Sequence, residues 1–466
     1  RIRAYRGGYL PTERREAEKA MRDGNIDGIV STSALELGVD IGSLDVVVLN
    51  GYPGSVAATW QRIGRAGRRQ QASLGVLVAS SDPLDQYLIR HPEFFSDASP
   101  EHARIHSDQA LILLDHIRCA AFELPFLSGE RFGPIDAAPY LEVLGESGVL
   151  HQEGERWEWI ADSYPANAVS LRSVADGNFV VVNRTDGRQT IIAEVDFSSA
   201  PLTLYEGAIH MIQSTPYQVE KLDWEGRKAY VTRTHVDYYT DAIDYTKLKV
   251  LERFDGVNAG RGNAHHGEVH VVRRVSGYKK IRYYTHENIG YGPVNLPDQE
   301  LHTTAAWWQL PQTVLDEAFD SRQAALDGFL GAAYALHVVA TVAVMAEAHD
   351  LQKAVGSGDG AWFAVSDGRG RGQLRGDDGN ISDINRADRF IPTVYLYDNY
   401  PGGVGLSEPL WKRQSELLKR AIEMVSECDC KSGCPACVGP VLAADECLIE
   451  SPKMLTAKVL ALLVNP

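Results

Sequence analysis

The sequence predicts a multidomain protein of the α/β plus α+β class, and three observations support this fold class. Apolar strand patterns alternate with helical patterns over residues 1–95, which is typical of a parallel α/β sheet. Short β-strand patterns separated by Gly and Asp turns fill residues 166–300. The last part of the chain is largely helical and contains four cysteines within ten residues. The 466 residues are enough for three to four domains.

The first region, residues 1–95, is predicted to hold a parallel-sheet lobe. Its strand candidates are 28–32, 44–50 and 74–80, and the chain also opens on a strand pattern. Helices are expected at 12–22 and at about 55–66, between the strands. Strand and helix therefore alternate as they do in a parallel sheet.

Three further regions follow. Residues 96–165 are predicted to form a winged-helix-like module, because helical patterns precede an alternating strand at 154–159. Residues 166–300 form a β-rich accessory region, and residues 301–466 a helical region. Within the helical region, residues 328–346 carry no formal charge, but Ala, Gly and one His favour a buried helix over a membrane span. We therefore expect no membrane partner.

Charge and cysteine content limit the class of protein. The net charge is −16, yet residues 1–75 hold eleven Lys and Arg against eight Asp and Glu, so any nucleic-acid surface must be local. Six cysteines in so long a chain do not make a disulfide scaffold. The chain starts on a strand pattern without Met or signal peptide, and we expect it to be the rear part of a longer protein.

Two motifs in the first region carry the strongest functional signal. Residues 31–42 follow a strand, and residues 61–69 are predicted on a helix after the next strand. Arg65 and Arg68 are three residues apart, so on a helix both guanidiniums would point into one cleft and suit a phosphate whose charge grows during transfer. Gly64 and Gly67 would keep that face open. The alternative is a solvated basic helix.

These segments resemble motifs V and VI of superfamily 2 helicases, and residues 5–16 look like the strand and helix that precede them in the second RecA-like lobe. The resemblance implies that Arg65 and Arg68 contact the γ-phosphate of ATP. It places Gly38 and Asp40 beside the nucleotide, and Gln61 closing the cleft. The residues it implies for contact with nucleic-acid phosphates are Arg6, Gly7, Ser31 and Thr32.

Further segments narrow the family. Residues 35–42, 51–55, 84–87 and 398–406, with the terminal cysteines, resemble the bacterial mitomycin repair factor A helicases and their fungal RecQ4-like relatives. The resemblance implies ATP- and Mg²⁺-driven 3′→5′ movement on single-stranded or partly duplex DNA, in DNA repair. A monomer at the nucleoid in the bacterial cytoplasm is expected.

The sequence contains no G-x-x-x-x-G-K-[ST] motif, so nothing in it would cradle the β-phosphate. We therefore expect an upstream RecA-like lobe as partner, and no ATP hydrolysis by this piece alone. Two other functions stay open. One is an RNA-directed motor of the same superfamily, and the other is an ATP-gated protein-interaction platform on DNA.

The cysteine cluster has the spacing C-x-C-x₃-C-x₂-C. Four thiolates this close can form a tetrahedral shell around a structural Zn²⁺ ion. An iron–sulfur cluster and redox-paired cysteines are the alternatives. The predicted ligands are Cys428, Cys430, Cys434 and Cys437.

A second candidate DNA surface lies at residues 273–284, predicted as a hairpin in which five cations alternate with three tyrosines. Cations suit backbone phosphates and tyrosines suit base stacking. A hairpin charged only for solubility is the alternative. The candidate cations are Arg273, Arg274, Lys279, Lys280 and Arg282.

Overall fold

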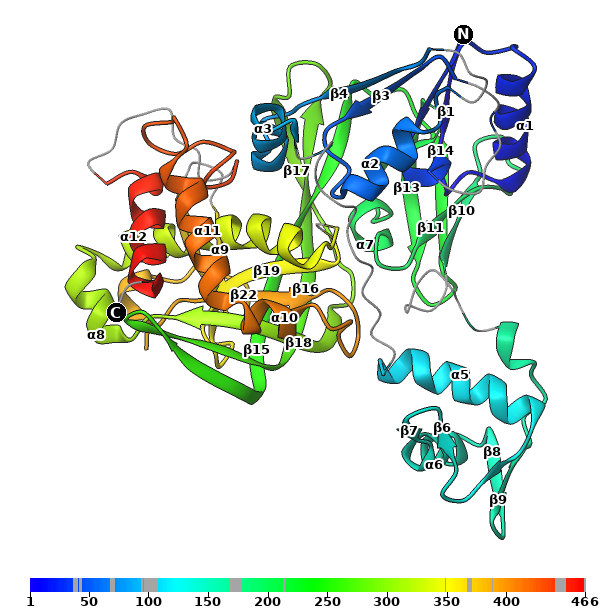
Figure 1. The fold of residues 1–466 in the computed structure, drawn as a ribbon. Coiled ribbons are helices and arrows are strands. Elements are labelled where there is room, and N and C mark those ends of the chain that lie inside the picture. The colour runs from blue at the N-terminus through cyan, green and yellow to red at the C-terminus, as the bar shows by residue number, and fades with distance from the viewer. Residues whose placement is uncertain are drawn as a thin grey trace.

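The computed structural model describes residues 1–466 except 37–40, 42–43, 68–71, 94, 96–107, 168, 170–177, 213, 348, 367–370, 388, 441–449 and 465–466. Figure 1 shows an N-terminal lobe, in blue, beside a five-stranded sheet. A larger sheet is covered by the helices of the C-terminal region, in yellow to red. A small module, in cyan, stands apart from these at the end of its connections.

The N-terminal lobe contains two pairs of parallel strands, β1 with β2 and β3 with β4, as the alternating pattern predicted. Helix α2 begins after Ser55, whose hydroxyl accepts a hydrogen bond from the Ala58 N–H at 3.0 Å. The elements are β1 (Ile2–Tyr5), α1 (Pro11–Arg22), β2 (Gly28–Ser31), η1 (Ser33–Leu35), β3 (Val46–Asn50), α2 (Val56–Ile63), β4 (Leu74–Val78) and α3 (Pro83–Arg90).

The next module has the arrangement of a winged helix. Its three-stranded sheet has the order β5-β9-β8, and β8 and β9 form the wing hairpin. The core lies between the helices, where Ile117 and Leu141 are fully buried. The elements are α5 (Ala110–Glu123), β5 (Phe126–Leu127), β6 (Arg131–Phe132), β7 (Ile135–Asp136), α6 (Ala138–Glu146), β8 (Leu150–Glu153) and β9 (Arg156–Trp159). A 3₁₀ turn η2 (Pro165–Asn167) follows.

The first part of the β-rich region forms the five-stranded sheet, in the order β11-β10-β14-β13-β12. Its buried residues alternate along the strands, as in Phe179 and Val181 or Ala229 and Val231, because one face packs on the core. The elements are β10 (Asn178–Asn183), β11 (Thr190–Asp196), α7 (Ala200–Thr203), β12 (Ile209–Ile212), β13 (Thr215–Asp223) and β14 (Lys228–Arg233).

The rest of the chain builds an eight-stranded sheet in the order β15-β16-β18-β22-β19-β20-β21, with β17 beside β16. The predicted boundary between residues 300 and 301 falls inside β18, so strands on both sides of it share this sheet. Its strands are β15 (Tyr238–Ala259), β16 (Gly262–Arg282), β17 (Asn288–Pro293), β18 (Gln299–Gln309), β19 (Leu351–Gly356), β20 (Trp362–Ser366), β21 (Gly372–Gly376) and β22 (Thr393–Asp398).

The hairpin predicted at residues 273–284 is wrong, because these residues continue along the single strand β16 and into the turn after it. A Cβ on Gly277 would lie 2.9 Å from the carbonyl oxygen of Gly292 on β17, so glycine is required there for close approach of two strands.

Among the described residues after β18, five helices pack around the sheet, and α9 is the central one. By length and composition α9 could span a membrane, but 72% of its apolar window is buried inside the fold, which confirms the prediction of a buried helix. Gly328 and Gly331 let α12 approach α9 closely. The helices are α8 (Gln312–Ala318), α9 (Arg322–Val344), α10 (Ser407–Lys412), α11 (Gln414–Ser426) and α12 (Pro452–Val464), and η3 (Ile384–Arg386) is a 3₁₀ turn.

Candidate nucleotide, nucleic-acid and zinc sites

Four residues predicted to face nucleic-acid phosphates gather at one edge of the N-terminal lobe. Tyr5 pairs with Ser31 across the parallel strands β1 and β2, so Arg6 and Gly7 leave β1 where Thr32 leaves β2. All four predicted residues are exposed, and a Cβ on Gly7 would meet nothing within 4 Å. The carboxyl ends of neighbouring parallel strands are a usual place for ligands. The structure brings the four together, and their contact with DNA stays a prediction.

The loop after β1 is also docked on the five-stranded sheet. The Glu194 N–H on β11 donates to the carbonyl oxygen of Gly8 at 3.2 Å. A Cβ on Gly8 would lie 2.7 Å from the Glu194 carbonyl oxygen, so only glycine fits. The next residue, Tyr9, is buried in the core of that sheet. The position of Arg6 and Gly7 is therefore fixed by a second domain.

His210, on β12, is a neighbour of this loop that the sequence did not single out. Burial and, to a smaller extent, the positive charge of Arg6 lower the pKa of His210 to about 4. The imidazole is therefore neutral at pH 7 and adds no positive charge beside Arg6. No motif marks this position, because its environment comes from strands distant in the sequence.

The helix expected to carry both candidate arginines is shorter than predicted. α2 ends at Ile63, and Gly67 turns the chain with a φ of +86°. The prediction that a helix carries Arg65 is therefore wrong, because α2 ends before Gly64 instead of continuing through it. Gln61, on the last turn of α2, is exposed.

Arg65 instead reaches back to the 3₁₀ segment after β2. Its Nε donates to the carbonyl oxygen of Glu36 at 3.1 Å, and its terminal nitrogen donates to the same oxygen. The carboxylate of Glu36 pairs with Arg62 at 2.9 Å. Two arginines of the second motif are thus attached to the chain of the first motif, which confirms that the two segments meet in space.

Three predicted nucleotide residues, Gly38, Asp40 and Arg68, lie outside the described residues. Their roles stay predictions.

Asp85 is a buried residue whose part sequence reasoning missed. Its carboxylate, 2% exposed, accepts hydrogen bonds from the Tyr52 N–H at 2.7 Å and the Ser80 N–H at 2.6 Å. It therefore fastens the loop after β3 to the loop after β4. The only signal for it in the sequence is that residues 84–87 carry part of the family resemblance.

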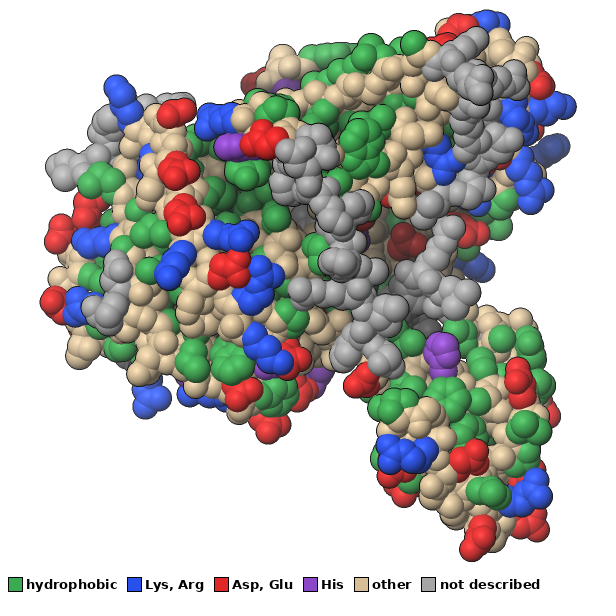
Figure 2. Space-filling model, viewed as in Figure 1, with side chains coloured by type: hydrophobic (Ala, Val, Ile, Leu, Met, Phe, Trp, Pro, Cys, Tyr) green, Lys and Arg blue, Asp and Glu red, His purple; other side chains and the backbone are tan. Residues whose placement is uncertain are grey.

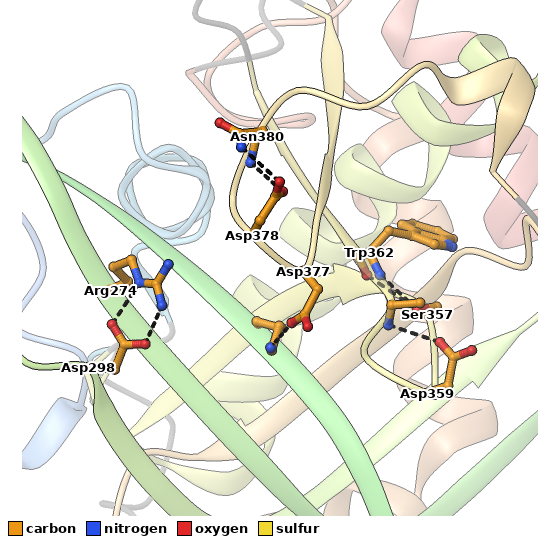
Figure 3. Close-up of polar contacts among 10 residues, drawn as sticks. Arg274, Asp298, Ser357, Asp359, Trp362, Asp377, Asp378 and Asn380 are labelled. Atoms are coloured by element: carbon orange, nitrogen blue, oxygen red, sulfur yellow. Dashed lines mark hydrogen bonds and ion pairs between the residues drawn. The ribbon is translucent and has the colours of Figure 1, made fainter.

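The cations predicted to bind DNA lie on β16, and four of the five contact acidic or aromatic side chains of the protein itself. Figure 3 shows Arg274 held by both oxygens of Asp298. Lys279 lies opposite Asp241 in the strand register. The partners of the others are Asp244 for Arg273 at 2.6 Å, Asp237 and Glu287 for Arg282 at 3.2 Å each, and the Tyr238 ring for Lys280 at 5.4 Å. This surface is thus less basic than the sequence suggested.

A small cavity of about 40 Å³ lies beside Arg274 and Asp298. Lys247 and Asp377, which form an ion pair, and the Phe363 ring complete much of its lining. Such a volume holds only a few water molecules. The ion pairs beside the cavity join β15 to the turn after β21 and β16 to the loop before β18 (Figure 3).

The loop between β22 and α10 joins the winged-helix module to the large sheet. Asp398 is fully buried, and its carboxylate accepts from the N–H groups of Val404 at 2.8 Å and Leu406 at 3.0 Å. The Gln109 amide, at the N-terminus of α5, donates to the carbonyl oxygen of Pro401 at 2.8 Å. The loop is thus held in shape by hydrogen bonds to Asp398, and it provides the contact with the winged-helix module.

The four predicted zinc ligands converge on one point. Their sulfur atoms all lie within 4.8 Å of one another. The Sγ–Sγ distances are 3.5 Å for Cys428–Cys434, 3.4 Å for Cys430–Cys437 and 3.8 Å for Cys434–Cys437. A tetrahedron with Zn–S bonds of about 2.3 Å has edges of about 3.8 Å, whereas a disulfide needs about 2.05 Å. The arrangement fits a tetrahedral metal and excludes disulfides among these pairs.

The surroundings also fit a cation. Burial raises the pKa of the Cys437 thiol, so a thiolate there needs a positive partner. The Cys434 N–H donates to the Cys437 sulfur at 3.3 Å, and Gly433 adopts a φ of +123° in the turn between the ligand pairs. Lys453 of α12 donates to the carbonyl oxygens of Cys428 and Cys430 at 2.6 and 3.0 Å. The knuckle is therefore fixed to the C-terminal helices.

Three family models match the chain. They are the MrfA Zn-binding domain over residues 332–438, the helicase conserved C-terminal domain over residues 1–70, and the ATP-dependent helicase HRQ1 winged helix domain over residues 105–174. The first ends directly after Cys437 and identifies the metal of the cysteine site as structural zinc. The third confirms the predicted winged helix.

Two curated relatives are similar along nearly the whole chain. The uncharacterized ATP-dependent helicase YprA of Bacillus subtilis is 44% identical, over 94% of this chain and 55% of its own length. The ATP-dependent helicase HRQ1 of Saccharomyces cerevisiae is 29% identical, over 97% of this chain and 41% of its own length. The chain thus spans about half the length of these relatives.

Solved structures agree. The crystal structure of DUF1998 helicase MrfA bound to DNA has 43% identity and a TM-score of 0.67, and the match covers 99% of this chain and 57% of that one. The same helicase bound to DNA and AMPPNP matches with 41% identity and a TM-score of 0.62, over 98% of this chain and 56% of that one. The similarity therefore covers every region of the chain.

Proposed function

Because the chain belongs to the MrfA family of superfamily 2 helicases, we propose that it is the rear part of an ATP-dependent DNA helicase that moves 3′→5′ on single-stranded DNA. We further propose that it acts in DNA repair, as a monomer, at the nucleoid of the bacterial cytoplasm. The substrate would be single-stranded or partly duplex DNA. YprA and HRQ1 are ATP-dependent helicases, and the similar helicase MrfA has been crystallised with DNA.

The observation that carries the proposal is the exposed edge at the ends of β1 and β2. Arg6 offers a cation, and Gly7 an uncovered backbone, beside the hydroxyls of Ser31 and Thr32. A cation, hydroxyls and free N–H groups are the donors that contact nucleic-acid phosphates. They do not read base identity, which suits a motor that moves along any sequence.

The exposed faces of the parallel strands in the N-terminal lobe support the proposal that a further motor lobe or segment packs on it. Parallel sheets are normally covered on both faces. Here apolar side chains of all four strands are exposed, which are Ile2 (72%), Val30 (65%), Val46 (51%), Val48 (60%), Leu74 (56%) and Val78 (48%). We propose that polypeptide carrying a phosphate-binding loop covers part of this surface and supplies the missing half of the ATP site.

In that complete site, Arg65 and Arg68 would contact the γ-phosphate, and Gly38, Asp40 and Gln61 would lie beside the nucleotide and its Mg²⁺ ion. Arg65, in the second motif, already donates a hydrogen bond to the carbonyl oxygen of Glu36 in the first motif. A guanidinium held in this way can exchange one acceptor oxygen for a phosphate oxygen when nucleotide binds. This is how the two motifs would sense ATP together.

The test joins this chain to a first motor lobe that has a phosphate-binding loop. We expect DNA-stimulated ATP hydrolysis and strand separation, both lowered by about 10³-fold or more in Arg65→Ala and in Arg68→Ala. Arg15→Ala, exposed on α1, is the matched control and should retain both activities. Full activity in both motif variants would refute the motor assignment. Competition between DNA and RNA strands of one sequence separates a DNA motor from an RNA motor.

A further inference from the structure

The winged-helix module has the fold of a DNA reader but the opposite charge. The described residues 108–167 hold eleven Asp and Glu against three Arg and no Lys. Two of the arginines pair inside the module, Arg118 with Asp115 at 3.7 Å and Arg156 with Glu158 at 3.2 Å. Binding to DNA phosphates depends on cations that replace counterions. A module with a charge of −8 repels that backbone.

The helix that precedes the wing is the one that enters the major groove in helix-turn-helix proteins. Here it is α6, with the sequence APYLEVLGE, which contains no cation. Its exposed side chains include Glu142, Val143 and Glu146. The wing adds Glu153 and Glu155 at its turn. The one arginine of the wing, Arg156, is paired with Glu158, so neither element presents an unpaired cation to a phosphate or to a guanine edge.

The same module exposes aromatic side chains. Phe122, at the end of α5, contacts the rings of Trp159 and Tyr164 edge-on, with centroids 5.4 and 5.3 Å apart. Phe122 is 42% exposed and Tyr164 is 56% exposed. We call Phe122, Trp159 and Tyr164 the aromatic patch. Glu123 and Asp162, both exposed, adjoin it in sequence, and Figure 2 shows apolar and acidic side chains interspersed over the visible face of the module.

We propose that the winged-helix module is a protein-docking module, in which the aromatic patch binds apolar side chains of a Lys- and Arg-rich segment of a partner protein. Charge complementarity selects that partner, since the module carries eleven carboxylates against three arginines and exposes Glu123 and Asp162 next to patch residues in the sequence. Exposed aromatic side chains supply the anchor contacts on which most interface energy depends. In this proposal the cationic edge of the N-terminal lobe binds DNA, and the acidic winged-helix module binds the partner protein.

The test uses the full chain with its zinc bound and a labelled peptide of about 18 residues, made of Leu and Lys in amphipathic helical order. Fluorescence anisotropy measures its binding. We expect Tyr164→Ser, Phe122→Ser and the double variant Glu123→Gln/Asp162→Asn each to weaken peptide binding by about tenfold or more. Thermal unfolding of each variant checks that it is folded. If Phe122→Ser does not fold, the result for Tyr164→Ser, whose side chain is the more exposed, decides the test.

The matched control is Asp186→Asn/Glu225→Gln, two exposed carboxylates of the five-stranded sheet. It should bind the peptide within about twofold of the unchanged chain, and an equal loss there would mean that net charge alone attracts the peptide. Binding to a single-stranded oligo(dT) is measured in parallel. A loss of DNA affinity in Tyr164→Ser would make the patch a base-stacking surface and overturn the proposal, as would an absence of peptide binding. DNA binding that fails in every variant and in the unchanged chain would contradict the helicase proposal instead.

Discussion

The zinc knuckle and the edge of the N-terminal lobe are both built from short motifs, but they differ in what completes them. The knuckle takes all four ligands from ten residues, and its sulfur atoms already stand at tetrahedral distances. The lobe edge brings Arg6 and Ser31 together across two strands, while apolar side chains of the same strands remain exposed. One motif is complete in itself, and the other needs further polypeptide.

The difference shows which sites a sequence can specify alone. A site whose ligands are close in sequence depends on local turns, such as the one that Gly433 makes. A site between two motor lobes depends on surfaces that a single lobe cannot supply. The stability of the two regions should therefore respond differently to single substitutions, and the following experiments compare them.

The largest effect is expected at the zinc knuckle. Cys437→Ser should release zinc and destabilise the C-terminal helices by about 5 kcal/mol or more, because structural zinc contributes its binding free energy to folding. Zinc content and urea unfolding monitored by tryptophan fluorescence measure this. Cys119→Ser is the matched control, since Cys119 lies on α5 outside the cluster. A Cys437→Ser chain that keeps one zinc and unfolds normally would show that the knuckle does not need its fourth thiol.

The second-largest loss of stability is expected when the buried carboxylate of Asp85 in the N-terminal lobe is removed. Asp85→Ala leaves the N–H groups of Tyr52 and Ser80 without an acceptor, which costs about 3 kcal/mol. Asp82→Ala removes only an N-cap bond to the Leu84 N–H, at about 1 kcal/mol. Urea unfolding of both variants gives the two values. Equal losses would mean that Asp85 acts as a helix residue only and does not join the two loops.

The sequence predicted the local features well. The parallel strands, the winged helix, the buried helix α9 and the cysteine cluster all depend on periodicity or spacing that a short window contains. The strands β2, β3 and β4 are found within a few residues of their predicted bounds. The features that were easiest to predict are those whose structure depends on residues close together in the sequence.

The predictions that were wrong depend on distant contacts. The hairpin expected at residues 273–284 does not form there, because Gly277 lies within β16 and closely approaches Gly292 on another strand. The helix expected to carry Arg65 stops at Ile63, because the chain turns at Gly67 to reach the strand before it. The cations of β16 looked free in the sequence, but carboxylates from β15 and from the loop before β18 neutralise them. None of these partners is close in sequence.

His210 offers a pH-dependent comparison. Its pKa in the folded chain is about 4, below the usual 6.5, so the unfolded chain takes up the proton first. The contribution of neutral His210 to the free energy of unfolding is complete above pH 6.5. It is lost as the pH falls from about 6.5 towards about 4, by at most about 3 kcal/mol. His210→Gln should flatten the acid side of the stability profile, measured by urea unfolding between these values. His235→Gln, exposed, is the control, and an unchanged profile in His210→Gln would place the acid sensitivity elsewhere.

The smallest expected effect separates docking of the lobe from contact with DNA, because two adjacent glycines have different surroundings. Gly8→Ala would put a methyl group 2.7 Å from the Glu194 carbonyl oxygen, and we expect a loss of about 1–2 kcal/mol as the lobe and the five-stranded sheet move apart. Gly7→Ala meets nothing within 4 Å and should leave stability unchanged, so any loss of single-stranded DNA binding in that variant reports on the backbone at this edge. Urea unfolding and oligo(dT) anisotropy on both variants give a two-by-two comparison. If Gly7→Ala were the destabilised variant and Gly8→Ala the neutral one, the sheet would not hold the loop, and Arg6 would have to be positioned by the N-terminal lobe alone.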